Sequence, residues 1–436
     1  MQALNYLYFL IITFLGIKFL YSKGVVVRHP LDRTQQMLLD GPEMFWVLTF
    51  STGLLAFSAE GIGVDLMALR LMVLEVFCFL GLFVAKHRPV WSLAVWAYVV
   101  YLMWIIIGCF YSSSFAYGIR TVLKYLFPFL LMLFASAAVR HAEVFLKAGL
   151  GALWVALACL AFNFIPGISL FVPGVFWYGT AAAINFISIM VFCLTLYYFT
   201  NERRKYLLLA MLFLLPCFIW VFRTSIMGSI VALSGFYFIK YRFRSLPIIA
   251  GILVAGVIAV FTIPSLHQKM FKKNSQNLTI EEFQEGEVTM DNVETNAREA
   301  MWENAEKRFY KKHPIIGAGT GHLQRYMYHD FGDPNVRDVI HSDFVQQKCD
   351  NGLIGLILYD LIAVCVFLHC LKTYHSTDSI PIQMCALTAG ASIIGVYATL
   401  YSDNVVNYSM ATLSMPFGFY GMLLGLLKAE KSREWL

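Results

Sequence analysis

Four ionisable side chains in this 436-residue chain have types and positions suited to chemistry on an anionic substrate. Arg120 opens one apolar block, Arg223 lies between two others, Arg298 lies in a long polar segment, and His341 directly precedes a further apolar block. Charge beside or inside apolar segments is costly, so it indicates function. The planar guanidinium group suits phosphate, and histidine is the usual general base near neutral pH. We therefore expect a bound anion next to a base.

Further charged residues accompany these four. Lys124 lies one helical turn after the first arginine, and Asp403 lies near the start of the last apolar block, where it would orient the histidine or hold an acceptor hydroxyl. Arg70 and Glu75 are better explained by pairing within or between helices, and Asp360 is a further charge within a block. For each of these residues, snorkelling or an internal salt bridge is the ordinary alternative. For His341 the alternative is a polar loop residue.

A glycine-rich run, GAGTG at 317–321, is a second candidate element. Backbone N–H groups at Gly317 and Gly319 could cradle a phosphate, but we favour a flexible turn as the explanation of the run. No predicted strand precedes the run, so a dinucleotide-binding fingerprint is not indicated. The sequence has no HExxH motif, no paired cysteine ligands, no P-loop lysine and no G-x-S-x-G elbow, so no zinc site, ATPase or serine hydrolase is expected.

Composition identifies the elements that position these residues. Hydrophobic residues make up 59% of the chain and charged residues only 14%, whereas soluble domains carry about 25% charge. A soluble enzyme and a disordered chain are thereby excluded. The apolar residues form long blocks instead of alternating with polar ones, which argues against a β-barrel. We predict an all-α polytopic membrane protein with about 12–13 transmembrane helices.

Blocks of about 20 apolar residues, long enough to cross a bilayer, give the expected spans. They are 3–21, 44–59, 65–85, 90–110, 119–138, 144–165, 180–199, 206–222, 224–240, 246–264, 351–371, 380–400 and 406–427. The first lacks a basic leader and a cleavage site, so it is taken as a span. Basic residues gather in alternate loops, which places those loops and the C-terminus in the cytoplasm. The N-terminus is then outside if there are 13 spans.

The topology divides the chain into an N-terminal bundle (1–264), an external loop (265–350) and C-terminal helices (351–436). Within the loop, NAREAMWENAEKRFYKK predicts an amphipathic helix with a capping box at Asn296 and Glu299. Its apolar face comprises Met301, Ala305 and Phe309, with Trp302 beside them. The net charge of +6 reflects the topology and gives no support to a nucleic-acid partner. Nine cysteines, eight of them in apolar spans, indicate packing residues and no disulfide framework.

The ordered motifs resemble the signature of the O-antigen ligase and O-antigen polymerase superfamily. HPIIGAGTGHLQ is similar to its first element, and HSDFVQQKCDNGLIGLILY, about 16 residues later, to its second. The matching positions are His313, Pro314, Gly317, Gly319, His341, Gln346, Gly352 and Gly355. Ser342 stands where the family usually has asparagine, and Asp350 stands at the position of the family's usual acidic residue. NAREAMWENA resembles the family's Arg-x-x-x-Trp helix, and FRTSIMGSIVAL its arginine-containing span.

The resemblance implies a GT-C-like, all-helical glycosyltransferase in the bacterial inner (cytoplasmic) membrane, with its active site on the periplasmic or outer side. The implied donor is a glycan linked to undecaprenyl diphosphate. The implied acceptor is a lipid-linked repeat unit or lipid A-core, both within the lipid bilayer. Neither a nucleotide sugar nor a metal is expected as a cofactor.

In this reading the leaving diphosphate gains charge, which arginines in a water-poor groove stabilise. Arg223 and Arg298 are the first candidates, then Arg120 with Lys124 in support. His341 would accept the proton of the attacking hydroxyl, and direct attack inverts the anomeric centre.

Three functions stay open. We favour a polymerase of O-antigen or related surface polysaccharide because no lipid A feature is visible, but a ligase shares the same motifs. A polysaccharide flippase is disfavoured because no internal repeat is evident and the cations lie at one membrane face. Sugar identity, linkage, oligomeric state and a Gram-negative or Gram-positive source are not encoded in these motifs.

Overall fold

A computed structural model of the chain describes residues 2–30, 34–55, 66–164, 179–219, 222–272, 279, 282, 298–329 and 339–433. The first half comprises α1 (Gln2–Leu20), β1 (Val25–Arg28), β2 (Gln36–Leu39), α2 (Gly41–Ser51), α3 (Leu66–Val84), α4 (Leu93–Tyr111), α5 (Phe115–Ala138), α6 (Ala142–Phe164), α7 (Thr180–Phe199) and α8 (Arg203–Ile219). The second half comprises α9 (Arg223–Tyr241), η3 (Arg242–Ser245), α10 (Leu246–Thr262), α11 (Pro264–Met270), α13 (Arg298–Ala305), the π-helix η6 (Glu306–Tyr310), α14 (His322–His329), α15 (Asp343–Ser376), α16 (Ile380–Thr399), η7 (Val405–Tyr408) and α17 (Ser414–Arg433).

The predicted all-α membrane fold is confirmed. Each of the 13 predicted spans overlaps one of these helices, and strand is limited to the short antiparallel pair β1–β2 among the described residues. Seven helical stretches in this part of the chain are long and apolar enough to cross a membrane, with α9 to α10 counted as one. Helices suit this setting because they satisfy their own backbone hydrogen bonds. The count of 12–13 spans stays a prediction.

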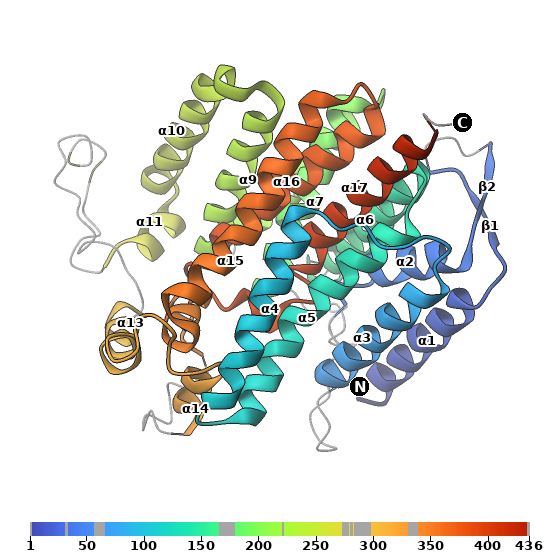
Figure 1. Cartoon of the computed structure of the whole chain (residues 1–436). Coiled ribbons are helices and arrows are strands. Elements are labelled where there is room, and N and C mark those ends of the chain that lie inside the picture. Colours follow the sequence, from blue (N-terminus) through green and yellow to red (C-terminus); the bar gives the residue numbers. More distant parts are fainter. Residues whose placement is uncertain are drawn as a thin grey trace.

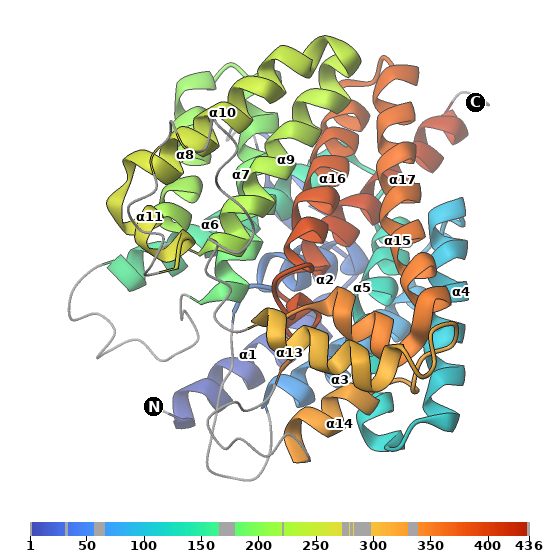
Figure 2. The same cartoon turned by 90° about the vertical axis from the view of Figure 1, so that its left-hand side faces the viewer.

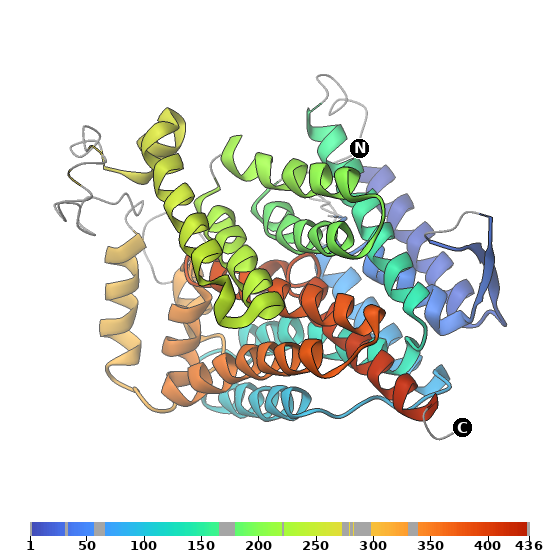
Figure 3. The ribbon, with the colours of Figure 1, turned by 90° about the horizontal axis from the view of Figure 1, so that it is seen from above.

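The helices pack as a bundle around α5, α7, α16 and α17 (Figure 1). α16 packs against α7, α9, α15 and α17, while α5 packs against α3, α4 and α17. Figure 3 shows α10 at the periphery beside α9, and β1–β2 on the opposite edge next to α1 and α2. α10 has no buried residue, and its main neighbours are α9 and α11.

The two ends of the bundle differ. In Figures 1 and 2, α13 and α14 lie at the end where α1 begins, whereas α17 finishes toward the other end. This arrangement agrees with the predicted parity, in which the N-terminus shares a side with the large loop. We call the end that carries α13 and α14 the loop end.

A small second core holds the loop end together. Ala305, Phe309, Tyr326 and Val345 are among its buried members, and Met301 and Trp302 pack against it. The predicted apolar face of the loop helix is therefore confirmed. The proposed cap at Asn296 lies outside the described residues.

One predicted boundary is wrong. The span placed at 351–371 falls in the second part of α15, which is two helices joined at Gly352, whose φ is +67°. The span placed at 406–427, however, begins at Ser414. Residues 400–413, which we call the α16–α17 connection, instead form turns and the short helix η7. This connection is apolar because much of it is buried in protein, not because it crosses the membrane.

The expected pairing of Arg70 with Glu75 is also wrong. Arg70 donates hydrogen bonds to the carbonyls of Leu55 and Thr52, the latter at 2.6 Å, just after α2. Glu75 makes no ion pair with Arg70 in the described part of the chain, and its Oε1 is buried. All nine cysteines are free thiols and eight are buried, as expected for packing residues.

Candidate functional site

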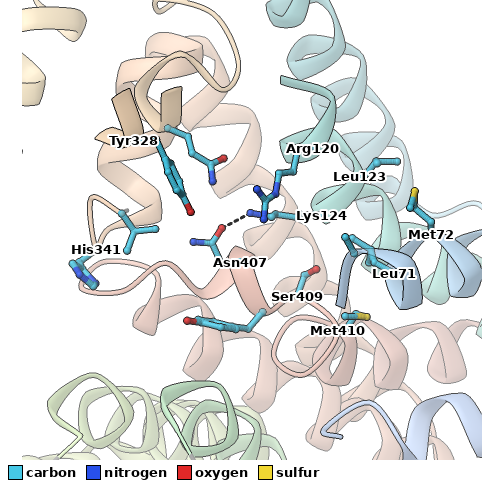
Figure 4. Close-up of a pocket in the computed structure, with 14 residues that line it drawn as sticks. Leu71, Met72, Arg120, Leu123, Lys124, Tyr328, His341, Asn407, Ser409 and Met410 are labelled. Atoms are coloured by element: carbon cyan, nitrogen blue, oxygen red, sulfur yellow. Dashed lines mark hydrogen bonds between the residues drawn. The ribbon is translucent and has the colours of Figure 1, made fainter. Parts of the chain in front are cut away.

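A cavity of about 420 Å³ opens at the loop end of the bundle (Figure 4). Its walls come from α3, α5, α14, the residues before α15 and the α16–α17 connection. Arg120, Lys124 and His341, three of the side chains singled out in the sequence, line it. The fold thus brings together residues more than 200 positions apart in the chain.

The two cations of the cavity come from α5. Arg120 and Lys124 are four residues apart, so they lie on one face of the helix. Arg120 is exposed, whereas Lys124 is half-buried and donates a hydrogen bond to Oδ1 of Asn407. Figure 4 shows both side chains on the same side of the cavity, with His341 across from them. An anion between these walls would be attracted by two positive charges.

The wall that α3 contributes is apolar. Leu71 and Met72 lie there, joined by Leu123 from α5 and Met410 from the connection. Met72 is 45% exposed, and Val76 on the same helix is also exposed. The cavity therefore combines two cations with an adjoining apolar surface that continues outward along α3. Such a site suits an amphipathic anion.

His341 is held by its backbone in an uncommon conformation. Its φ is +53°, which a residue with a side chain adopts only when its surroundings impose it. Its N–H donates to Oδ1 of Asn404 at 2.6 Å, and the preceding carbonyl of Ile340 accepts from the indole of Trp302 at 2.7 Å. Nδ1 of His341 lies 3.9 Å from Oδ1 of Asp403. The imidazole is 39% exposed, so the ring is accessible, and the carboxylate of Asp403 lies nearby but beyond hydrogen-bond distance of Nδ1.

The α16–α17 connection is fastened to the start of α15. Nδ2 of Asn404 donates to Asp343 and Gln346, at 3.2 Å each. Oδ2 of Asp343 in turn accepts from the N–H of Val406 at 3.1 Å. Asn404 therefore links the backbone of His341 to two side chains of the next helix.

Arg298 and Arg223 contact carbonyls beside the cavity instead of lining it. Arg298 donates to the carbonyl of Ser402 at 2.6 Å, one residue before Asp403. Arg223 donates to the carbonyl of Lys269 at 3.1 Å, and its neighbour Thr224 shares a hydrogen bond with Ser402. Both arginines thus lie near the α16–α17 connection. The structure separates them from the cation pair on α5.

The comparison with known families falls on this part of the chain. Residues 222–359, from α9 to the middle of α15, match the O-antigen ligase family. This match agrees with the superfamily resemblance that the motifs predicted. No curated protein matches the chain.

We call the matched residues 222–359 the superfamily segment. It includes Arg223, Arg298 and His341, whereas α3, α5 and the α16–α17 connection lie outside it. Both cations that line the cavity are on α5. The segment therefore provides the histidine and Trp302 behind it, the α16–α17 connection provides Asn404 and Asp403, and the rest of the bundle provides the cationic and apolar walls.

The glycine run of the superfamily segment serves the local fold. The N–H groups of Gly317, Gly319 and Gly321 donate to His313, to the Asp350 carbonyl and to the Asp350 carboxylate, respectively. A Cβ on Gly317 would lie 2.3 Å from that same carbonyl. Backbone carbonyls thus accept the two N–H groups, of Gly317 and Gly319, that the sequence suggested for a phosphate. In this structure Gly317 and Gly319 support the kink after Asp350.

Several cavity residues were not identified from the sequence: Gln324, Tyr328, Asn407 and Tyr408, with Asn404 behind them. A signal is present for Asn407, because its amide stands at the start of a predicted membrane span, and Asn404 lies just before that span. The loop-helix residues gave no comparable signal. No group of three or more His, Cys, Asp or Glu side chains able to hold a metal is found among the described residues.

Proposed function

We propose that this multi-pass membrane protein transfers a glycan from a lipid-linked diphosphate donor to a sugar hydroxyl, at the outer face of the bacterial cytoplasmic membrane. One observation carries the proposal. A single cavity combines two cations, a histidine beside a carboxylate and an apolar wall. The superfamily match supports glycosyl transfer as the reaction class.

The diphosphate of the donor binds between Arg120 and Lys124, and its polyisoprenyl chain leaves along α3. The amphipathic cavity supports this pose, because the cations and an adjoining set of apolar side chains line the same space. Undecaprenyl diphosphate is the donor lipid that the superfamily resemblance implies. The sugar then extends from the cations toward His341.

The reaction forms one bond and breaks one. The acceptor oxygen attacks the anomeric carbon, the bond from that carbon to the diphosphate oxygen breaks, and its electron pair leaves with the diphosphate. The acceptor proton passes to Nε2 of His341, since Nδ1 faces Asp403. Direct attack inverts the anomeric centre. Fixed cations near the leaving oxygens stabilise the charge that develops there.

In this scheme Arg223 and Arg298 do not contact the substrate and act through the residues that they bind. Arg298 holds the carbonyl of Ser402, next to Asp403, whereas Arg223 holds the carbonyl of Lys269 in α11 and its neighbour Thr224 contacts Ser402. The reaction as proposed uses no metal ion. The cations on α5 stabilise the negative charge of the leaving diphosphate, which a metal ion does in other enzymes.

Two acceptors are compatible with this reaction, a lipid-linked repeat unit and lipid A-core. We favour a lipid-linked repeat unit, which makes the protein a polymerase of O-antigen or a related surface polysaccharide. The matching family is described as O-antigen ligase, and this favours lipid A-core as the second candidate.

Deletion of the gene, followed by gel analysis of surface polysaccharide, tests both. Loss of long chains with a single repeat still attached to core supports a polymerase. Long lipid-linked chains accumulating beside bare core support a ligase. Loss of lipid-linked repeats from the outer face would identify a flippase and overturn the proposal. A reporter fused at Asn277 should read as external, and a cytoplasmic signal would overturn the topology.

A further inference from the structure

Two adjoining cavities lie at the end of the bundle opposite the candidate active site. α5 carries Arg120 near its start and runs to Ala138, and α6 then begins at Ala142, so residues early in α6 lie at the far end. One cavity there has a volume of about 310 Å³ and the other about 590 Å³. They share Pro30, Leu150 and Trp154, which makes them one continuous surface.

The smaller cavity is basic. Arg28 at the end of β1, His29 and Lys147 of α6 line it. Nζ of Lys147 donates to the carbonyl of Arg28 at 3.4 Å, which holds the strand against the helix. An ammonium group has three donors, so this contact leaves Lys147 able to bind a ligand as well. Two permanent cations thus converge on one small space.

The larger cavity is apolar and lies between α6 and α8. Leu153 and Leu157 form one side, and Leu208, Leu209 and Leu212 form the other. Trp154 stands beside the opening and is 66% exposed. Lys205 lies at the α8 start, where it pairs with Glu202 at 2.6 Å. Among the described residues that line the two cavities, none is acidic.

The dimensions match one leaflet of a bilayer. Ten residues separate Lys147 from Leu157 on α6, which corresponds to about 15 Å of helix. A bilayer's hydrocarbon core is about 30 Å thick, so the groove extends from one membrane boundary to about the middle. A soluble anion would use only the basic cavity and leave the leucine-lined groove empty.

We propose that these two cavities form a binding site for one anionic diacyl phospholipid of the leaflet opposite the active site. Its phosphate binds between Arg28 and Lys147, and one acyl chain lies between α6 and α8 along the leucines. Basic pockets between membrane helices favour anionic headgroups through charge complementarity. This site is separate from the cavity that carries the proposed transfer reaction.

Native mass spectrometry of the full chain in uncharged detergent tests the site, with dioleoyl phosphatidylglycerol as the probe. We expect tighter binding of this lipid than of dioleoyl phosphatidylcholine. The double variant Arg28→Gln/Lys147→Gln should weaken phosphatidylglycerol binding at least tenfold, since each cation near an anionic headgroup contributes to affinity. Its matched control is Lys372→Gln/Lys431→Gln, which removes two exposed cations outside both cavities and should bind as the wild type does.

A second pair of variants tests the acyl-chain groove. Leu212→Trp fills the groove, whereas Leu215→Trp places the same side chain on an exposed position of α8 outside it. Only the first should weaken lipid binding. Unchanged phosphatidylglycerol binding in Arg28→Gln/Lys147→Gln, equal binding of the two lipids, or displacement of phosphatidylglycerol by inorganic phosphate at millimolar concentration would each overturn the proposal. Thermal unfolding of each variant checks that it is folded.

Discussion

Two pairs of cations lie near the same end of the bundle and have different surroundings. Arg120 and Lys124 of α5 line a cavity, whereas Arg223 and Arg298 of the superfamily segment bind backbone carbonyls. The segment that matches the family contains the histidine, whereas the cations that line the cavity with it come from a helix outside that segment. A family match can thus include the proposed base of a site and leave out the cations beside it.

The largest effect is expected at the proposed general base, which lines the same cavity as Arg120 and Lys124. His341→Ala should lower the transfer rate by about 10²–10⁴, the usual value of a general base. The measurement is turnover of a lipid-diphosphate-linked glycan by purified protein. His329→Ala, on α14 outside the cavity lining, is the control and should retain activity. Full activity in His341→Ala would refute the assignment of the base.

The cation pairs themselves give the second prediction. Arg120→Ala should lower the rate by about 10²–10³, the typical cost of removing one charge-stabilising donor. Arg298→Ala should cost only about tenfold, because that guanidinium acts through the Ser402 carbonyl. The two variants are compared in one assay at matched expression. A larger loss in Arg298→Ala than in Arg120→Ala would reverse the comparison and favour the order inferred from sequence.

Asn404 tests whether the connection positions the histidine. Asn404→Ala removes the acceptor for the His341 N–H and the links to Asp343 and Gln346. We expect kcat to fall by about tenfold with little change in KM, since the residue does not line the cavity. Asn201→Ala, at an exposed position before α8, serves as the control. A change confined to KM would contradict a positioning role.

The smallest effects concern stability. Gly352→Ala would place a Cβ 2.3 Å from the Ile315 carbonyl at a φ of +67°, and we expect a loss of about 1–3 kcal/mol in the free energy of unfolding. Gly251→Ala on α10 meets nothing within 4 Å and should be neutral or stabilising by about 0.5–1 kcal/mol. Thermal unfolding monitored by tryptophan fluorescence distinguishes the two. Equal midpoints would show that the kink tolerates a side chain.

The sequence predicts the helices well because the cost of placing polar groups in lipid is large, and only apolar blocks avoid it. It fails where apolar residues are buried in protein instead. Val405, Val406, Ala411 and Leu413 are buried in the α16–α17 connection, so the connection was taken for the start of a span. The kink at Gly352 likewise depends on contacts with Ile315, which no local pattern encodes.

The candidate site was predicted in part for a similar reason. Charge in an apolar background identified Arg120, Lys124 and His341, which the structure gathers around one cavity. The same signal identified Arg223 and Arg70, whose hydrogen bonds go to backbone carbonyls distant in the chain. A sequence does not say whether a guanidinium will meet a carbonyl or a ligand. That choice depends on tertiary packing.

The apolar wall of the cavity affects how activity must be measured. Met72 and its exposed neighbours on α3 connect the cations to the surrounding lipid. A donor that enters along this surface diffuses in two dimensions, so its relevant concentration is a surface density. Dilution with inert detergent at constant donor per volume should therefore slow the reaction, and rates should follow the mole fraction of donor in the micelle.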